Sequence, residues 1–143
     1  MPDPSIAESV ERIVFAGVAL TTRALAEARP SLELTFPQWR VLVVLGGRPD
    51  GATVSDVAAR IGVTAPATSR QLRRLERRGL VTVAPDERDR RASRARLTPE
   101  GTTARDAIVS YRRRRIEESV AGVEVDSAAA AQLARVADAF DRW

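Results

Sequence analysis

The sequence contains no cysteine, no histidine and no lysine, and only 4% of its residues are aromatic. Without cysteine there is no disulfide framework, no thiolate nucleophile and no thiol redox switch. Without histidine there is no serine–histidine–aspartate triad and no conventional zinc site. Without lysine neither a Walker-type phosphate loop nor a Schiff base can form. Carboxylate pairs remain as the main catalytic option, and we expect no metal and no cofactor.

Long apolar runs are missing as well. The first ten residues carry two acidic side chains and no basic one, which is unlike a signal peptide. The longest uncharged stretch in the amino-terminal third covers residues 13–22, too short to cross a bilayer. With 143 residues, 44% of them hydrophobic, the chain is long enough for one compact unit. We therefore expect a cytoplasmic protein with no membrane partner.

The basic residues are all arginine, and they are unevenly placed. Residues 60–96 hold eleven arginines and four acidic residues, a net charge of +7, whereas the rest of the chain sums to −3. Such an asymmetry is typical of a nucleic-acid-binding protein. The absence of lysine by itself is best explained by a lineage bias toward arginine. A solvated, salt-bridged surface is the alternative for the basic segment, but the segment has few acids to pair with its arginines.

The apolar periodicity predicts a mainly α-helical protein. Capping residues and proline or glycine breakers divide it into helices over these segments: 5–29, 35–46, 53–62, 64–79, one from Thr98 and one from Asp126. Two short β-branched or alternating stretches, 80–83 and 94–97, predict a β-hairpin whose tip is residues 85–91.

The helices over 53–62 and 64–79 follow the helix-turn-helix pattern, with Gly62 in the tight turn and Thr64 as the cap. Thr68, Leu72 and Leu75 form an inward stripe on the second helix, and arginines occupy the opposite face. A basic helix of this kind fits the major groove. We predict contacts to bases from Thr64, Pro66, Ala67, Ser69, Arg70 and Arg73, and contacts to phosphates from Arg74 and Arg77.

The hairpin tip carries Arg88, Arg90 and Arg91 together with Asp89. Arginine is attracted to a narrow minor groove, where the negative potential is strong. The Asp89 carboxylate lies near enough in sequence to accept hydrogen bonds from an adjacent guanidinium and fix its direction. An exposed hairpin with incidental ion pairs is the alternative, and it would contribute little free energy.

Four segments resemble the MarR-type winged helix-turn-helix transcriptional regulators: 64–70 (TAPATSR), 75–81 (LERRGLV), 86–91 (DERDRR) and 97–101 (LTPEG). The resemblance implies a winged helix-turn-helix with a small β-hairpin wing and a helical dimerisation lobe. Residues 34–97 would bind DNA, and residues 1–33 and 98–143 would form the lobe. It further implies a homodimer that binds a pseudo-palindromic double-stranded DNA operator, as a repressor, with Arg91 as the main wing arginine and Arg90 beside it.

The resemblance also bears on sensing. Thr68 and Arg73 depart from the residue types usual in the family, which affects the expected base preference and not the expected fold. Oxidant sensing through cysteine and metal sensing through histidine are excluded here. Many members bind a small aromatic or phenolic effector between the two lobes. Phe36, Trp39, Arg40 and Tyr111 are the candidates to line such a pocket, with an ordinary core role as the alternative.

Other functions stay open at this point. A winged helix can serve as a module for non-specific DNA binding or for protein binding. A small carboxylate enzyme would have to use Glu117 and Glu118, or Asp86 and Asp89, in stretches that give no reason for shifted pKa values. The arginine run 112–115 is interpreted as a solvated or cross-dimer ion-pairing turn.

Overall fold

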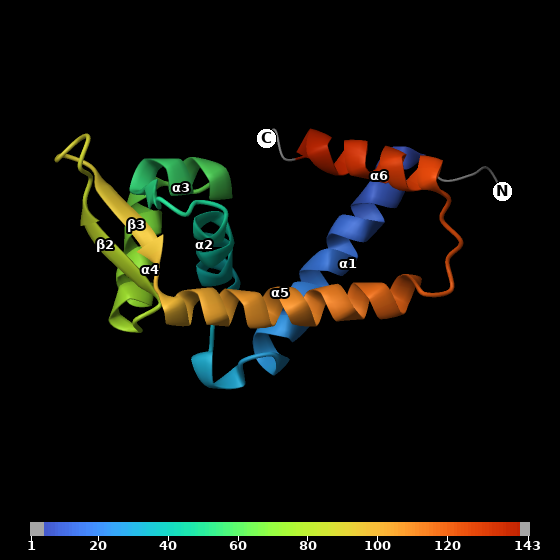
Figure 1. Ribbon diagram of the computed structural model, residues 1–143, viewed down its shortest axis with the longest axis horizontal. Helices are drawn as coiled ribbons and strands as arrows, with labels where there is room; N and C mark the ends of the chain where they lie inside the picture. Colours follow the sequence, from blue (N-terminus) through green and yellow to red (C-terminus); the bar gives the residue numbers. More distant parts are fainter. Residues whose placement is uncertain (1–4, 141–143) are drawn as a thin grey trace.

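The structure is a computed structural model, and it describes residues 5–140. The elements occur in this order: α1 (Ile6–Glu27), the 3-10 helix η1 (Pro30–Leu32), α2 (Phe36–Gly46), β1 (Ala52–Thr53), α3 (Val54–Ile61), α4 (Ala65–Arg77), β2 (Val81–Pro85), β3 (Ser93–Leu97), α5 (Pro99–Val120) and α6 (Ser127–Phe140). The prediction of a mainly helical protein with one hairpin is confirmed (Figure 1).

The helices begin where the sequence indicates because side chains satisfy their first backbone N–H groups. Three of them have a reciprocal capping box: Ser5 with Glu8, Thr35 with Gln38, and Thr53 with Asp56. Three more are capped by one side-chain oxygen, from Thr64, Thr98 and Asp126. Local sequence thus determines these six helix starts before any tertiary contact is considered.

The sheet has three antiparallel strands in the order β1-β3-β2. The predicted hairpin is present, with Val81 opposite Leu97 and Pro85 opposite Ser93. Its strands run closer to the tip than predicted, because cross-strand pairing continues into the polar residues. Strand β1 was not predicted, since two residues are too few to show a period. It joins the sheet only by pairing with β3.

One hydrophobic core joins most of the elements. It is built from the inward faces of α2, α3 and α4, the base of the hairpin, the end of α1 and the start of α5. Its members include Trp39, Leu42, Ile61, Leu72, Leu75, Leu80 and Ile108. The start of α5 packs closely on the chain before β2. A Cβ at Gly101 would collide with the Leu80 carbonyl oxygen, so only glycine fits there.

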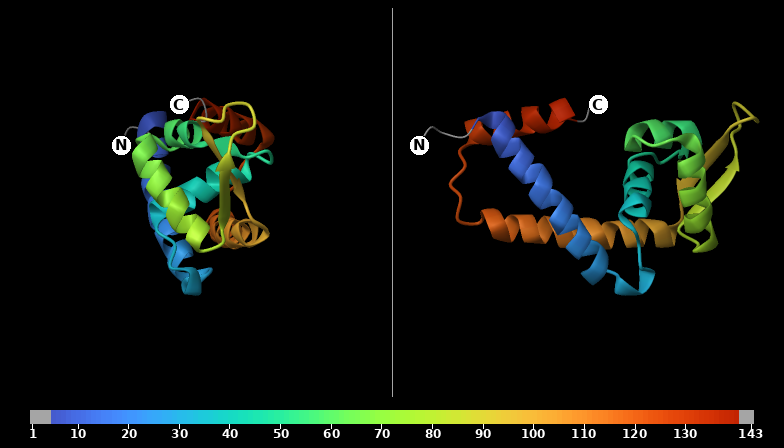
Figure 2. Two further views of the ribbon diagram at one scale, coloured as in Figure 1. Left: turned by 90° about the vertical axis from the view of Figure 1, so that its left-hand side faces the viewer. Right: turned by 180° about the vertical axis from the view of Figure 1, so that it is seen from behind.

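The terminal helices are much less buried. The predicted amphipathic helix at the amino terminus is present, but its apolar stripe is buried only near its end, at Ala24 and Leu25. The apolar side chains of Ile6, Ile13, Val14 and Val18, nearer its start, are at least half exposed. Helix α6 buries none of its residues. Figure 2 shows α1 crossing α5, with α6 beyond it on the side away from the hairpin.

Candidate nucleic-acid interface

The turn between α3 and α4 has the geometry that the helix-turn-helix pattern predicts. Gly62 is left-handed, with φ of 68°, and its N–H together with that of Val63 reaches back to carbonyls at the end of α3. Two residues later the Thr64 hydroxyl accepts the Ala67 N–H at 3.4 Å and starts α4. The glycine therefore reverses the chain in the space of one residue, and α4 begins directly after it.

Helix α4 separates its side chains by face. Thr68, Leu72 and Leu75 are buried as predicted, and the Thr68 hydroxyl donates to the Thr64 carbonyl at 3.2 Å. On the other side, four exposed arginines and Glu76 surround a shallow cavity of about 410 Å³: Arg70, Arg73, Arg74 and Arg77. At the amino-terminal end Thr64 and Pro66 are exposed, whereas Ala67 and Ser69 are half-buried. The predicted contact residues thus share the accessible side of α4.

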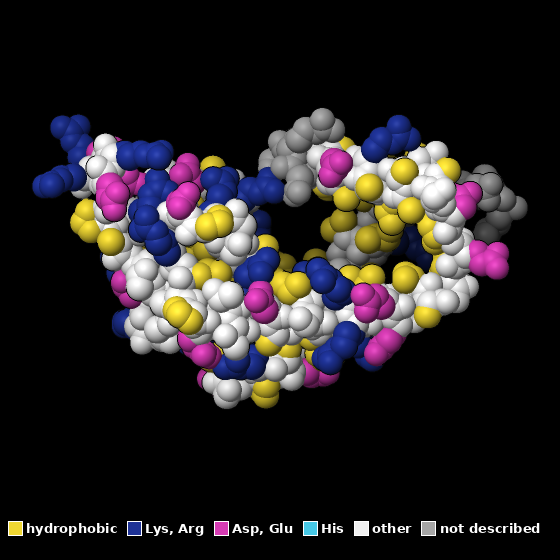
Figure 3. All heavy atoms as spheres, in the orientation of Figure 1, with side chains coloured by type: hydrophobic (Ala, Val, Ile, Leu, Met, Phe, Trp, Pro, Cys, Tyr) yellow, Lys and Arg dark blue, Asp and Glu magenta, His cyan; other side chains and the backbone are white. Residues whose placement is uncertain are grey.

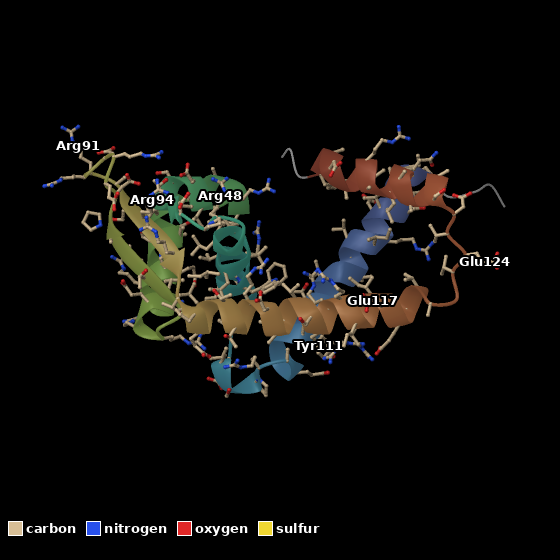
Figure 4. All side chains as sticks on the ribbon, in the orientation of Figure 1. Arg48, Arg91, Arg94, Tyr111, Glu117 and Glu124 are labelled. Carbon is tan, nitrogen blue, oxygen red and sulfur yellow. The ribbon has the colours of Figure 1, made fainter. Side chains whose placement is uncertain are left out.

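The three tip arginines of the hairpin, Arg88, Arg90 and Arg91, are all exposed. Figure 4 shows Arg91 at the far end of the hairpin, directed away from the body of the molecule. Figure 3 shows basic side chains gathered over the hairpin tip. Seen from the left of Figure 1, α4 and the hairpin face the viewer together (Figure 2, left). The protein therefore presents two adjacent cationic elements, helix α4 and the tip of the β-hairpin.

The base of the tip is held by Asp86, which is 3% exposed. One carboxylate oxygen accepts the backbone N–H groups of Arg88 at 2.7 Å and Asp89 at 3.2 Å. The other accepts Arg94 Nε at 2.6 Å, and Arg94 Nη1 donates to the Gly51 carbonyl at 2.9 Å. The hydrogen bond from the Arg88 N–H, with Arg94 and the Asp89 N–H, holds the pKa of Asp86 below its ordinary value despite burial.

The expected role of Asp89 needs a correction. Its carboxylate accepts the backbone N–H of Arg91 at 3.0 Å, so the contact found is with the main chain and not with a guanidinium. The turn is closed further by the Ala92 N–H, which donates to the Asp89 carbonyl at 2.9 Å. Backbone N–H groups compete successfully here because they lie two residues away in a tight turn. Asp89 therefore shapes the tip, and through it the position of Arg91.

Two arginines of the basic segment, Arg78 and Arg94, hold parts of the fold together through hydrogen bonds within the chain. Arg78 Nη1 donates to Gln38 Oε1 at 3.2 Å, which ties the end of α4 to the first turn of α2. Arg94 is committed to Asp86 and Gly51 as described. Counting charge along the sequence cannot separate these buried contacts from exposed ones. Fewer arginines are therefore exposed for binding DNA than the net charge of +7 in residues 60–96 indicates.

The four candidate effector-pocket residues are not brought together in one cavity. Phe36 lines an apolar cavity of about 970 Å³ between α1 and the later turns of α5. Trp39 and Arg40 line a separate cavity of about 300 Å³. Tyr111 lies at the edge of the core and donates to Glu27 Oε2 at 2.5 Å. That hydrogen bond, followed by burial, raises the pKa of Tyr111, so the phenol stays un-ionised.

Sequence reasoning gave Asp86 no role in shaping the hairpin tip, and it did not separate Arg112 from the other arginines of the run 112–115. An acid at the start of a charged turn is a common acceptor for the following N–H groups, and this pattern could have indicated Asp86. Arg112 follows the buried Ile108 by four residues, which places it on the inward side of α5. The run 112–115 is thus not uniform: Arg115 pairs with Glu118 at 3.0 Å, in line with the ion-pairing prediction, whereas Arg112 is half-buried.

A helix-turn-helix followed by a hairpin on a shared core defines a winged helix-turn-helix protein. Comparison with known proteins agrees with this class. Residues 32–92 match the model of the MarR family. The transcriptional activatory protein BadR of Rhodopseudomonas palustris is 41% identical over 71 residues, which cover 48% of this chain and only 40% of BadR.

Solved structures match over nearly the whole chain. RV1404 from Mycobacterium tuberculosis superposes with a TM-score of 0.72 at 26% identity, covering 99% of this chain and 96% of that one. The transcriptional regulator PcaV from Streptomyces coelicolor, solved with its natural ligand, gives 0.63 at 29% identity and covers 97% and 99%. The chain is thus similar to the MarR family of winged-helix transcriptional regulators, in sequence over its winged helix and in fold over nearly its whole length.

The comparisons bear on one of the open alternatives. The matched family and relatives are transcription regulators and not enzymes, which agrees with the prediction of a regulator over that of a carboxylate enzyme. Within residues 5–140 no helix is both long enough and apolar enough to cross a membrane.

Proposed function

We propose that this regulator is a repressor that binds double-stranded DNA sequence-specifically, as a homodimer on a pseudo-palindromic operator. The observation that carries the proposal is the pairing of the arginine face of α4 with the arginine tip of the hairpin. The dimer would place two α4 helices in successive major grooves, about 10 base pairs apart. Residues 34–97 would form the DNA-binding part, and residues 1–33 and 98–143 the dimerisation lobe.

Each accessible side chain has a proposed role at the DNA. Toward the start of α4 the side chains would face base edges, where an arginine can bind O6 and N7 of guanine. These are Thr64, Pro66, Ala67, Ser69, Arg70 and Arg73. Arg74 and Arg77, farther along, would bind phosphates and fix the register. Arg88, Arg90 and Arg91 would enter the adjacent minor groove, in the orientation that Asp86 and Asp89 give the tip.

The exposed apolar side chains of the terminal helices support the homodimer. Phe15 is 80% exposed, and several other large apolar side chains on α1, α5 and α6 are about half exposed or more: Ile13, Val14, Val18, Ile116, Leu133 and Phe140. A monomer rarely leaves so many apolar residues in contact with water. A second copy of the same helices would cover them by a two-fold arrangement, which suits a palindromic operator.

A small aromatic or phenolic effector would release the repressor. The apolar cavity beside Phe36 lies between α1 and α5, next to the first turn of α2. PcaV, at 29% identity, was solved with a natural ligand, which supports a ligand-responsive regulator here. The first turn of α2 also carries Gln38, which contacts Arg78 at the end of α4. A ligand that moves this turn can therefore change the position of α4.

Fluorescence anisotropy tests the DNA-binding proposal. The protein would be titrated into the labelled region upstream of its own gene, and into a scrambled duplex, at stepped salt. Each phosphate contact should steepen the logarithmic salt dependence by about 0.9, because bound counterions are released. Equal affinity for the two duplexes would favour a non-specific winged-helix module instead. Because BadR is named an activatory protein, a promoter-fusion assay is needed to show whether binding lowers transcription as we propose.

The Arg91→Ala variant tests the wing assignment. It should weaken operator binding by about tenfold, the cost of one specific arginine contact, while the dimer remains intact. The matched control is Arg113→Ala, which removes an exposed arginine on α5 far from the hairpin. If Arg91→Ala and Arg113→Ala bind the operator equally well, Arg91 does not contact DNA.

A further inference from the structure

One side chain on α4 holds the hairpin by a contact that the proposed DNA contacts do not use. Glu76 Oε1, on the last turn of α4, accepts the backbone N–H of Val83, in the middle of β2, at 2.9 Å. The two elements lie side by side (Figure 1). The hairpin is also tied to the loop before β1, through the hydrogen bond from Arg94 to the Gly51 carbonyl. Glu76 ties it directly to α4, the other element of the proposed DNA interface.

An acidic side chain on this face of α4 works against DNA binding. Glu76 is exposed, and it lines the shallow cavity that the four arginines of α4 surround. A carboxylate there reduces the positive charge that the face presents to phosphates. It also lies near the carboxy-terminal end of a helix, where the helix dipole disfavours negative charge. The hydrogen bond from Val83 gives Glu76 a role that its charge does not explain.

The bond reaches the free edge of the sheet. With the strand order β1-β3-β2, β2 has a neighbouring strand on one side only. Backbone groups point alternately to the two sides of a strand, so the N–H of Val83 and the position of Pro85 both face away from β3. Proline has no N–H group. Between Val83 and Pro85 the outer edge of β2 thus has one N–H group, and Glu76 accepts it.

The position of this anchor matters because the arginine tip lies beyond it. Three residues of strand, at about 3.3 Å each, place the base of the tip at Asp86 about 10 Å from Val83. Paired strands vary in twist over a range of about 25°. A rotation of about 20° at the anchor would move the base of the tip by about 3.5 Å, which is close to the rise of one base pair. A fixed anchor at Val83 therefore decides which base-pair step the tip can reach.

We propose that Glu76 is a positioning residue that couples α4 to the hairpin. It sets the distance along the DNA between the bases that α4 reads and the minor-groove step that Arg91 enters. Glu76 thereby contributes to sequence specificity without contacting DNA. This role in DNA binding rests on the proposed function, whereas the coupling of α4 to the hairpin does not.

Three variants of the full chain separate this role from an effect of charge. Fluorescence anisotropy should show Glu76→Ala binding the operator about five- to tenfold more weakly, although loss of an acid beside the arginines would by charge alone strengthen binding. Glu76→Gln loses the same charge but keeps an oxygen that can accept the Val83 N–H, so it should bind at least about threefold more tightly than Glu76→Ala. The matched control, Glu87→Ala, removes an exposed acid from the tip and should bind no more weakly than the parent.

Two further measurements show whether Glu76 acts through the hairpin tip. In an Arg91→Ala background, Glu76→Ala should cost less than about twofold, because the tip that it positions no longer contacts DNA. Hydroxyl-radical footprints locate the major-groove and minor-groove contacts on the operator. One base pair inserted between them should cost the parent about tenfold and Glu76→Ala less than about threefold. A residue that only stabilised the fold would show neither effect.

The coupling itself can be measured without DNA. Amide hydrogen exchange at Val83, followed by nuclear magnetic resonance in the free protein, should become about tenfold faster in Glu76→Ala. In Glu76→Gln it should stay within about threefold of the parent. Exchange at Leu72, in the core of the winged helix, should be unchanged in both variants, which confirms that they fold.

Three outcomes overturn the inference. One is unchanged exchange at Val83 in Glu76→Ala. Another is operator binding by Glu76→Ala that equals or exceeds that of the parent. The third is an equal loss of affinity from Glu76→Ala with and without Arg91, which would mean that Glu76 does not act through the tip. A parent protein that binds no duplex would disprove the proposed function, and exchange at Val83 alone would then decide the coupling.

Discussion

Leu72 on α4 and Phe15 on α1 are both large apolar side chains on amphipathic helices, yet Leu72 is 1% exposed and Phe15 is 80% exposed. The same difference in exposure separates two regions of the molecule, the winged helix and the terminal helices. The winged helix buries its apolar side chains within one chain, around α2, α3, α4 and the hairpin. The first half of α1 and all of α6 leave theirs at the surface. The apolar side chains of the first region are covered within the chain, with help from the end of α1 and the start of α5, whereas the second region exposes an apolar surface of the kind that marks protein interfaces.

Truncating a core leucine of the winged helix should give the largest effect. Leu72→Ala should lower the free energy of unfolding by about 2–5 kcal/mol, because it leaves a cavity between α4 and the rest of the core. Urea denaturation measures this. The matched control is Leu133→Ala on the exposed face of α6, made in a monomeric background such as Phe15→Glu. An equal loss at Leu133 would show that the two regions do not differ within one chain.

A charge on α1 should separate the subunits. Phe15→Glu should raise the dissociation constant of the dimer by about 100-fold, since it buries a carboxylate without a partner in the proposed interface. Sedimentation equilibrium measures it. The same charge placed at the exposed Ala59 on α3 should leave association unchanged. A Phe15→Glu protein that dimerises like the parent would mean that the exposed face of α1 lies outside the interface.

The smallest of these effects concerns the support of the hairpin tip. Asp86→Asn should weaken operator binding by about tenfold, because the amide directs a donor toward Arg94 Nε. The free energy of unfolding should fall far less than in Leu72→Ala. A hydroxyl-radical footprint should show the minor-groove protection lost and the α4 protection kept. Loss of both together would mean that Asp86 supports the whole fold and does not specifically position the tip.

The pH dependence follows from the lowered pKa of Asp86. A carboxyl whose folded pKa lies below its unfolded value of 3.8 contributes its stabilisation in full above that value. The contribution is lost only as the pH falls through the folded pKa. Because the chain has no histidine, operator affinity should stay nearly constant between pH 8 and pH 5.5. A titration of affinity in that range would point to a group other than Asp86.

Local patterns were sufficient for most of the secondary structure. The caps at Thr35, Thr53, Thr64 and Thr98 start helices where predicted, because a hydroxyl bonding to an N–H three residues away needs no distant partner. The same holds for Gly62 in its left-handed turn. Strand β1 and the full length of the hairpin strands could not be predicted this way, because they depend on pairing between residues far apart in sequence.

In the candidate site, too, some features follow from local sequence and others depend on distant residues. The exposed arginines of α4 were predicted from the helical period, since Thr68, Leu72 and Leu75 fix which side faces inward. Sequence alone could not distinguish Arg94, held by Asp86 and Gly51, from Arg91, which is exposed three residues earlier. Nor could the sequence show that Phe36 lines one cavity while Trp39 and Arg40 line another.

The sequence by itself determined the class of this protein, because helix caps, a glycine turn and the one-sided placement of arginine are all short-range features. It also excluded sensing through cysteine or histidine. Only the tertiary structure decided which charged side chains are exposed and free to bind a partner, and which are held in contacts within the chain. It buried Asp86, turned Arg78 toward Gln38, and placed Arg112 between two cavities. The physical reason is that the free energy of a charged side chain depends on its hydration and on its hydrogen-bond and ion-pair partners. Both are set by segments that meet only on folding.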